Sequence, residues 1–560
     1  MSRIRLALMA AAVLAAAFLL IALPLPSSQI ALPPASFEHP TAVGSFHVHT
    51  NRSDGSGSPD AVAAAAERAG LNFIVLTDHG DGTRKPDAPR YHSGVLVIDG
   101  VELSTQAGHY VALGLPQTPY PLRGEARDVV DDVRRFGGFG IVAHPDSVKP
   151  GLRWRDWNAS FDALEWLNAD TEWRDERPSE LARALARYPF RTAETLGSLL
   201  DRPGPTLERW DVMTQRRRVV AIAAADAHAR AGWRDDDVEG YRREWFLKIP
   251  SYDASFRTFA MRVALERPLS GDAAADATTV IGGLKRGAVF SAIDAIAAPA
   301  SFEFSASGTS GRIYPGDLVH ETASSVTFSA RTNSQRSGTI VLLKNGRTLT
   351  SGPLPELTFA ASGEGTYRVE VHLTASPGEP PVPWIVSNPV YIRPAGWGVR
   401  SPEPDVTRAI TRSIQGGPWH TEQDERSFAK IAQKDYPTGE VELAFRLASD
   451  GAGRYAALGI GVGKALTERT HLAFRARASR PMRVSVQARH PGTGNRWQRS
   501  IFLDPQPRDV IVRFTDMTPI GSSDTFDPAL ADTLLFVVDA TNTLPGAEGS
   551  FTLENLRVER

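Results

Sequence analysis

The chain has 560 residues, which is too long for one hydrophobic core and indicates roughly two to four domains. Its 62 Lys and Arg residues are balanced by 64 Asp and Glu residues, so no nucleic-acid partner is expected. It contains no cysteine. Disulfides, thiolate nucleophiles and Cys-bound zinc are therefore excluded, and any metal must be held by nitrogen and oxygen ligands.

The first 33 residues have the pattern of an export signal. Arg3 and Arg5 precede an uninterrupted apolar run over residues 6–23, which Pro24 ends. The run is longer than the core of most signal peptides and just long enough to cross a bilayer, so a cleaved signal peptide and an uncleaved anchor both remain open. In either case the rest of the chain is expected to be exported, periplasmic or extracellular, with membrane contact only through this segment.

Residues 34–297 alternate short apolar runs with helix-like stretches, a pattern typical of an α/β domain. One β-α-β unit can be followed completely. Strands are expected at 44–48 and 73–77, and the helix between them starts with Ser58 as N-cap and ends before Gly70. Strands joined in this way pair in parallel. The other strands are expected at 95–98, 110–113, 140–143, 163–167 and 219–223.

Two all-β regions follow. Residues 298–394 contain strands with period-2 alternation and a two-residue hairpin signal at Asn345-Gly346, which indicates an immunoglobulin-like β-sandwich. Residues 395–560 are expected to form a jelly-roll-like β-sandwich, with a second immunoglobulin-like fold as the alternative. Trp419 and Trp497 could stack on sugars or belong to the core, so a glycan is a candidate partner of this region.

Histidines and carboxylates gather at the ends of the expected α/β strands. His47 and His49 lie two apart in one strand, so their side chains face the same side and can share a metal, and Asp226 and His228 repeat this spacing. In a parallel α/β barrel, side chains at the carboxyl ends of the strands converge at one mouth. Nine candidate ligands are too many for one ion; the others are Asp54, His79, Glu102, His109 and His144.

These segments resemble the PHP (polymerase and histidinol phosphatase) family of metallohydrolases, in particular its exported CehA/McbA-like members. The resemblance extends over roughly residues 44–296 and rests on motifs such as Phe-His47-Val-His49-Thr and Thr-Asp-His79-Gly. It implies a distorted (β/α)7 barrel that binds up to three metals and hydrolyses mostly phosphoesters. It also implies metal ligands at His47, His49, Asp54, His79, Glu102, His109, His144, Asp226 and His228, with Glu102 bridging two ions.

The expected function is hydrolysis of a small-molecule ester, in the first place a phosphoester, by hydroxide activated at a di- or trinuclear metal cluster. The cofactors are divalent ions, and Zn, Mn and Fe all suit imidazole and carboxylate ligands. No general base is assigned, and the general acid is unidentified. One alternative is a carboxylester or carbamate hydrolase with the same cluster. Another is a non-catalytic envelope protein that binds carbohydrate.

Four tryptophans lie in the stretch 154–173. They could cover the mouth of the site, but packing against helices is the favoured interpretation. The cationic side chains near the motif loops are interpreted as solvated surface charges, so none is assigned to a phosphate; they are Arg52, Arg84, Arg90, Lys149 and Arg230.

Overall fold

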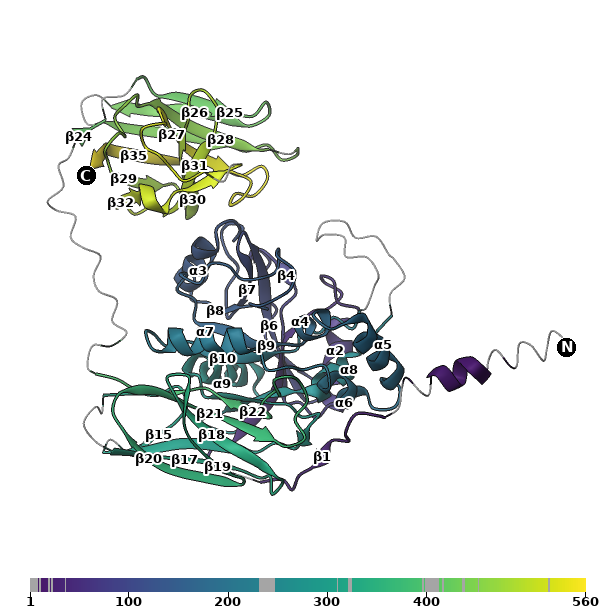
Figure 1. Cartoon of the computed structure of the whole chain (residues 1–560). Coiled ribbons are helices and arrows are strands. Elements are labelled where there is room, and N and C mark those ends of the chain that lie inside the picture. Colours follow the sequence, from purple (N-terminus) through teal and green to yellow (C-terminus); the bar gives the residue numbers. More distant parts are fainter. Residues whose placement is uncertain are drawn as a thin grey trace. The chain divides into compact units, whose positions relative to one another are not determined.

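The computed structural model describes residues 24–35, 37–230, 247–309, 311–320, 325–394, 417–435, 439–451, 453–521 and 524–559, with short pieces at 9, 12–18, 21, 397 and 412–414. The chain divides into two compact units, so it is multidomain (Figure 1). The first contains Met1–Asp81, Lys85–Pro116 and Glu125–Val399, and the second contains Gly82–Arg84, Gln117–Gly124 and Arg400–Arg560. Part of the predicted export segment 1–33 lies outside the described residues. Within those residues, no helix combines the length and the apolar character needed to span a bilayer.

Seven strands of the first unit lie side by side in a sheet that closes on itself. The strands β2, β3 and β6 pair in parallel, as do β8, β9 and β10, whereas β7 runs antiparallel to both of its neighbours. The chain beyond β10 returns to β2 through a parallel bridge between Val48 and Ala227. The bounds are β2 (Thr41–Val48), β3 (Phe73–Leu76), β6 (Val95–Thr105), β7 (Gly108–Leu113), β8 (Phe139–Val142), β9 (Ala163–Asn168) and β10 (Val220–Ala224).

Each strand predicted for the α/β region overlaps one of these seven strands, and the β-α-β unit is confirmed. The first helix is α2 (Pro59–Arg68), whose N-cap Ser58 accepts a hydrogen bond from the Ala61 amide at 3.2 Å, while Gly70 takes the left-handed φ of 76°. The hairpin from β6 to β7 replaces a helical crossover. The finer prediction of a distorted (β/α)7 barrel is therefore not confirmed.

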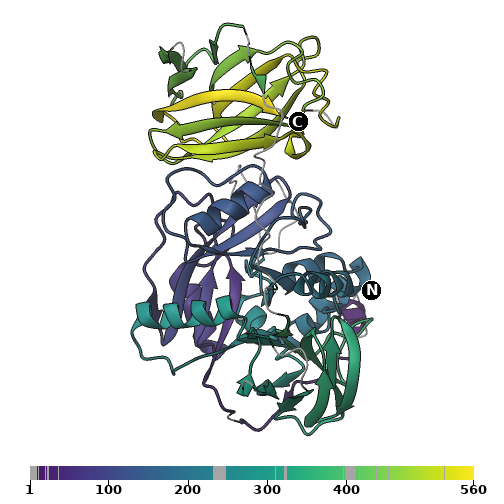
Figure 2. The ribbon, with the colours of Figure 1, turned by 90° about the vertical axis from the view of Figure 1, so that its left-hand side faces the viewer.

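The helices of the first unit lie around the outside of this sheet (Figure 2). After α2 they are α3 (Ala126–Arg135), α4 (Ala169–Arg174), α5 (Pro178–Arg187), α6 (Thr192–Gly197), α7 (Gly204–Thr214), α8 (Tyr252–Thr258) and α9 (Ala273–Arg286). Apolar side chains such as Phe46, Ile98 and Ile222 form the core. The remaining strands of this part are β1 (Ile30–Ala31), β4 (His79–Gly80), β5 (Arg90–His92), β11 (Ala260–Ala264), β12 (Val289–Ala292) and β13 (Ala297–Ala298).

Residues 298–394 add a β-sandwich to the first unit. One sheet has the order β15-β14-β17-β20, and its Phe328 stacks on Tyr367 of the facing strands with ring centroids 4.4 Å apart. The predicted hairpin is confirmed, since Asn345 and Gly346 both have positive φ between β18 and β19. The bounds are β14 (Phe302–Gly308), β15 (Gly311–Ile313), β16 (Leu318–Val319), β17 (Ser325–Thr332), β18 (Gly338–Lys344), β19 (Arg347–Pro353), β20 (Glu356–Ser362), β21 (Gly365–Leu373), β22 (Ile385–Ser387) and β23 (Val390–Ile392).

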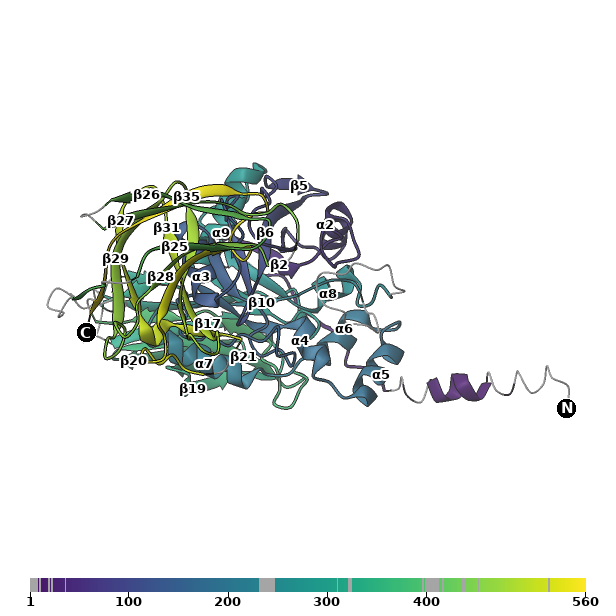
Figure 3. The same ribbon diagram turned by 90° about the horizontal axis from the view of Figure 1, so that it is seen from above.

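The second unit is an antiparallel β-sandwich, seen from above in Figure 3. One sheet has the order β26-β27-β35-β29-β32, with β24 beside β35, and the other has the order β25-β28-β34-β30-β31-β33. The bounds are β24 (Arg412–Ser413), β25 (His420–Gln423), β26 (Phe428–Asp435), β27 (Glu440–Arg446), β28 (Tyr455–Gly461), β29 (His471–Ala478), β30 (Met482–Arg489), β31 (Arg496–Leu503), β32 (Arg508–Arg513), β33 (Thr518–Ile520), β34 (Thr533–Asp539) and β35 (Glu548–Glu559).

The two tryptophans considered for sugar stacking both contact the core of this sandwich. Trp497 is 2% exposed and donates its indole N–H to the Asp524 carbonyl at 2.8 Å. Trp419 is partly buried and packs near Phe536, with ring centroids 6.3 Å apart. These contacts favour the core interpretation of Trp419 and Trp497, and glycan binding by this unit stays a prediction.

The sandwich of residues 298–394 is hydrogen-bonded to the α/β part. Strand β12 pairs with β22 in antiparallel register. Directly after β22, the buried side chain of Asn388 exchanges two hydrogen bonds of 2.8 Å with the backbone of Ala221 in β10 and donates a third, of 3.0 Å, to the Val289 carbonyl in β12. One amide side chain therefore makes hydrogen bonds to three backbone groups. Two of these groups belong to β10, the strand that leads to Asp226.

Replacement of Asn388 by alanine tests this connection. The variant leaves buried backbone groups without partners, so we expect the free energy of unfolding of the first unit to fall by about 2–4 kcal/mol. Chemical denaturation followed by tryptophan fluorescence measures the change. Asn158→Ala, at an exposed position of the same unit, is the matched control. Equal stability of the two variants would contradict the role given to Asn388.

Candidate metal centre

The nine predicted ligands form one connected cluster of side chains. Each has a nitrogen or carboxylate oxygen within 3.5 Å of another member. The ends of several strands bring the nine side chains together. His47 and His49 lie at the end of β2, Asp54 lies in the turn after it, and His79 begins β4. Glu102 and His109 lie in β6 and β7, His144 follows β8, and Asp226 and His228 follow β10. Residues that span about a third of the chain thus share one place in the fold.

The first group within the cluster consists of His47, His49 and Glu102. The two Nε2 atoms are 3.1 Å apart and lie 3.3 and 3.2 Å from Glu102 Oε2. Asp226 Oδ1 lies 3.3 and 3.4 Å from the same two nitrogens. Ligand atoms placed about 2.0–2.2 Å from a metal in a tetrahedron stand about 3.3–3.6 Å apart. The separations among His47, His49 and Glu102, 3.1–3.3 Å, are close to this spacing, so these three residues form one candidate donor set.

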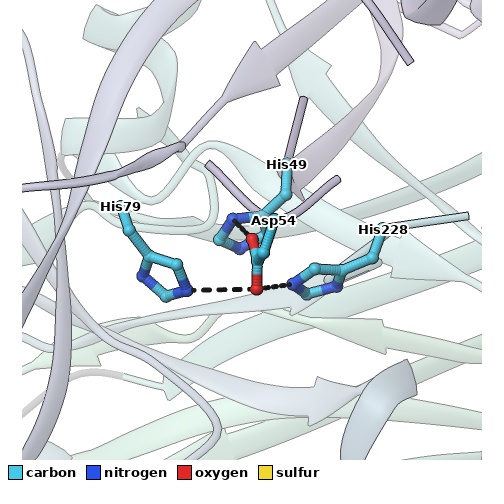
Figure 4. Close-up of side chains that lie close together, drawn as sticks. All are labelled: His49, Asp54, His79 and His228. Carbon is cyan, nitrogen blue, oxygen red and sulfur yellow. Dashed lines mark ion pairs between the residues drawn. The ribbon is translucent and has the colours of Figure 1, made fainter. Parts of the chain in front are cut away.

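The second group consists of His49, Asp54, His79 and His228 (Figure 4). Asp54 lies at its centre, with one oxygen 3.3 Å from His49 Nδ1 and the other 3.5 Å from His79 Nε2 and 3.2 Å from His228 Nε2. The His49 and His228 rings are stacked, with centroids 4.1 Å apart. A short-chain carboxylate surrounded by three imidazole nitrogens is a second suitable donor set for a divalent ion.

The third group consists of His79, Glu102 and His109. His79 Nδ1 lies 3.2 Å from Glu102 Oε2, while His109 Nδ1 and His144 Nε2 lie 2.8 and 3.0 Å from Glu102 Oε1. The two oxygens of Glu102 therefore face different sets of imidazoles. This is the arrangement that a carboxylate bridging two ions needs.

Two histidines belong to more than one group. His49 turns Nε2 toward Glu102 and Nδ1 toward Asp54, and His79 turns Nδ1 toward Glu102 and Nε2 toward Asp54. A neutral imidazole has a lone pair on only one of its nitrogens. Each of these rings therefore serves one group at a time, which limits how many fully liganded ions the cluster can hold at once.

Several ligand positions have an unusual backbone. His47, His144 and Asp226 have left-handed φ values of 63°, 28° and 43°. The pairing of β2 with β3 also shifts register between Ser45 and Val48. Such φ values cost non-glycine residues of order 1–3 kcal/mol each and persist where the surrounding structure enforces them. The strands are therefore bent where they carry the ligands, and the bends aim the side chains into the cluster.

Glu102 is the most constrained charge in the cluster. It is 1% exposed and lies within 3.3 Å of five imidazoles. Burial acts to raise the pKa of this carboxyl, but His79, His47 and His109 outweigh burial and hold the pKa well below its usual range. Glu102 is therefore ionised in the folded protein, despite its burial.

The imidazoles compensate the buried carboxylates. Burial acts to lower the pKa of His47, but Asp226, Glu165 and Glu102 outweigh it and raise this pKa well above the usual value. In the described part of the chain, every ion-pair partner of Glu102 and Asp226 is an imidazole. If these rings lost their protons, the buried carboxylates would be left without a positive partner. A bound cation would supply that charge.

A buried nitrogen without a hydrogen bond also fits a metal. His79 Nδ1 lies 3.2 Å from Glu102 but, among the described residues, has no partner with hydrogen-bond geometry. Buried polar atoms seldom remain unsatisfied in proteins. The donor set consists of imidazole nitrogens and carboxylate oxygens, which suits Zn, Mn and Fe alike. The residues present are therefore compatible with metal binding.

Glu165 is a member of the site that the sequence analysis missed. It is fully buried in β9, and its Oε1 lies 2.5 Å from His47 Nδ1. Its Oε2 accepts hydrogen bonds of 2.7 Å from the His144 amide and from the Asn168 side chain. A carboxylate at Nδ1 fixes the tautomer that leaves Nε2 free for a metal. The available signal was a single Glu inside the apolar run 163–167.

Asp78 was also missed, although it lies within the motif that supplied His79. Its carboxylate accepts hydrogen bonds of 2.7 and 2.8 Å from the amide and hydroxyl of Thr50 and one of 2.8 Å from the Ser53 hydroxyl. These residues form the turn that leads to Asp54. Asp78 therefore positions Asp54 through this turn.

Comparison with models of known protein families gives no match, and comparison with curated proteins gives none. Among solved structures, the chain is similar to a two-domain protein from Bacteroides vulgatus that contains a predicted PHP-like metal-dependent phosphoesterase, at 14% identity over 64% of this chain and 99% of that chain, with a TM-score of 0.31. It is also similar to the family 11 carbohydrate-binding module of a cellulosomal cellulase from Clostridium thermocellum, at 15% identity over 27% of this chain and 93% of that chain, with a TM-score of 0.22. Likenesses at this level establish no family.

Replacement of Glu102 by glutamine tests the cluster as a metal site. The amide keeps the shape but removes the charge, so we expect the bound metal to fall by roughly half or more. Elemental analysis of the desalted protein gives the metal content. Glu559→Gln is the matched control, because Glu559 is also buried and lies 3.0 Å from an imidazole, that of His471, in the second unit. Unchanged metal content in Glu102→Gln would contradict the site.

Replacement of Glu165 by glutamine tests its positioning role. Both oxygens of Glu165 accept hydrogen bonds, whereas an amide has only one acceptor oxygen, so either His47 Nδ1 or the His144 amide loses its acceptor. We therefore expect metal affinity to fall about 10–100-fold. Competition with a chromophoric chelator measures the affinity directly, without reference to activity. Glu208→Gln, at an exposed position on α7, provides the control. Equal affinities in the two variants would exclude a positioning role for Glu165.

Proposed function

We propose that the chain is an exported metal-dependent hydrolase whose substrate is a phosphoester. The observation that carries the proposal is the single cluster of nine ligand-type side chains, with spacings of 3.1–3.4 Å around its first group. All nine positions come from the motifs that resemble the PHP family and its CehA/McbA-like members. Membership of that family is part of the proposal.

The side chains of the cluster have distinct tasks in this proposal. Glu102 would bridge two ions, because its two oxygens face different imidazoles. Glu165 would orient His47, and Asp78 would hold the turn before Asp54. Asp226 is held by a hydrogen bond of 3.2 Å from the Asn168 side chain. His47, Asp54 and Asp226 are thus each positioned by a second residue, which would keep their donor atoms in place before a cation or a substrate arrives.

Two or three divalent ions, of Zn, Mn or Fe, would occupy the cluster. When bound, they would lower the pKa of water towards about 7 and neutralise negative charge on the substrate. The multi-ion donor set supports a phosphoester in particular, since its transferred group carries charge on several oxygens at once. A carboxylester or carbamate needs less charge compensation, and it remains the alternative substrate class for the same cluster.

Other parts of the proposal rest on the sequence. Export to the periplasm or cell exterior rests on segment 1–33, and a glycan partner of the second unit rests on the predicted sandwich at 395–560. A domain order of 34–297, 298–394 and 395–560 belongs to the same proposal. The comparison with carbohydrate-binding modules adds no weight to it at the identities found.

A substrate panel tests the proposed function. The full-length protein, loaded in turn with Zn, Mn and Fe, is assayed on nitrophenyl phosphate, bis-nitrophenyl phosphate and nitrophenyl acetate. We expect turnover of at least one phosphoester, a loss of about 100-fold or more after chelation, and recovery when metal is restored. Glu102→Gln should lose this activity, while the control Glu559→Gln should keep it.

The outcomes of the panel separate the function classes. Metal-dependent turnover of the acetate alone would reject the phosphoesterase and favour the carboxylester hydrolase. Retention on a polysaccharide with no turnover of any ester, at full metal occupancy, would favour the non-catalytic envelope protein instead.

A further inference from the structure

A cavity of about 250 Å³ adjoins the metal centre. It lies between the helices α4, α5 and α6 on one side and the segment 225–230, which follows β10, on the other. Asp226 and His228 line the cavity and also belong to the ligand cluster. The cavity and the proposed reaction centre therefore share two side chains.

The walls of the cavity are mainly apolar. Trp173 and several leucines line it, among them Leu181 and Leu196. The indole of Trp173 is held in place by a hydrogen bond of 2.9 Å to Asp170 and by the Arg174 guanidinium, which lies 4.5 Å from the ring centroid. Such walls bind hydrocarbon or aromatic groups, because these lose contact with water when they enter.

Two of the polar side chains in the wall, Thr195 and Glu172, bear on what the cavity can bind. Thr195 lines the cavity and is fully buried, and within the described residues its hydroxyl has no hydrogen-bond partner. Glu172 also lines the cavity; burial, together with the carboxylates of Asp146 and Asp175, raises the pKa of Glu172 well above its usual value. Burial therefore favours the uncharged form of Glu172, and the Thr195 hydroxyl can meet one polar atom of a ligand.

We propose that this cavity binds an apolar alkyl or aryl group of the ester substrate, so that the enzyme prefers phosphodiesters with one such group. The inference rests on the proposed function, since it places the phosphoester at the cluster and its apolar group beside Asp226 and His228. A dry cavity of about 150 Å³ holds a benzene ring. The present cavity therefore has room for one aromatic ring or a chain of about six carbons.

A series of substrates with increasing chain length tests the preference. The full-length, metal-loaded protein is assayed on 4-nitrophenyl methyl, butyl and hexyl phosphate, whose leaving group is constant. Each buried CH2 is expected to raise kcat/KM about threefold to fourfold, up to the hexyl compound. A flat series would overturn the preference.

A pair of variants on α5 tests the location. Ala184 lines the cavity, whereas Ala182 on the same helix is exposed and does not. Ala184→Phe fills the space, so the ratio of kcat/KM for the hexyl and methyl compounds should fall about tenfold or more. Ala182→Phe should keep the wild-type ratio. Metal content identical to wild type confirms that Ala184→Phe is folded, and equal ratios in the two variants would overturn the location.

A binding measurement separates the failure of this inference from the failure of the proposed function. Calorimetry compares n-hexylphosphonate with methylphosphonate, which are not hydrolysed. Tighter binding of the hexyl compound that is lost in Ala184→Phe supports the cavity. If the same protein turns over no phosphoester, only the proposed function is rejected. Equal affinities together with turnover of a phosphoester would reject the cavity and leave the proposed function standing.

Discussion

The structure around the cluster depends on a carboxylate that is ionised where no water reaches it. Glu102 is 1% exposed, yet its surroundings hold its pKa well below the usual range. Removing a carboxylate from water costs several kcal/mol, which only nearby positive charge can offset. Five imidazoles supply it: His47 and His49 at the end of β2, His79 and His109 at the starts of β4 and β7, and His144 after β8. Because all five rings must point at the two oxygens of Glu102, this one charge constrains how these parts of the chain lie relative to one another.

The backbone is strained to meet that requirement. His47, His144 and Asp226 adopt left-handed φ values, which cost non-glycine residues of order 1–3 kcal/mol each. The conformational free energy of these φ values must be offset by favourable contacts elsewhere in the unit. The hydrogen bonds of Asn388 to β10 and to Val289 are one such contribution, and they come from residues 298–394, outside the α/β part. The added sandwich thus stabilises the strand whose continuation carries Asp226 and His228.

Much of the site could be predicted because its histidines and carboxylates stand at or near the ends of apolar strands, where they are easily recognised. His47 and His49 stand two apart in an apolar strand, and Asp226 and His228 have the same spacing after another strand. Residues two apart in a strand face the same side, so the sequence predicted that each pair points toward one site. Glu165 gave a weaker signal, since one acid inside a buried strand does not say which histidine it faces. The strand β7 was predicted but its antiparallel direction was missed for a similar reason, because a short apolar run does not encode its direction. Backbone strain has no pattern in the sequence at all.

The segment after β10 contributes both to the ligand cluster and to the wall of the cavity, so a mutation in it would affect metal binding and the cavity together. Asp226 and His228 reach the ligand cluster, whereas Ala225, Ala227 and Ala229 are buried among apolar neighbours. All five residues also line the cavity. Small side chains at the alanine positions leave room beside the helices, and a larger side chain there would both reduce the cavity and push on a backbone that already has a positive φ at Asp226. Substitutions on the helix side, as at Ala184 or Leu196, reach the cavity without touching this backbone. The preference for an apolar group can therefore vary through the helices while the donor atoms of the cluster stay in place.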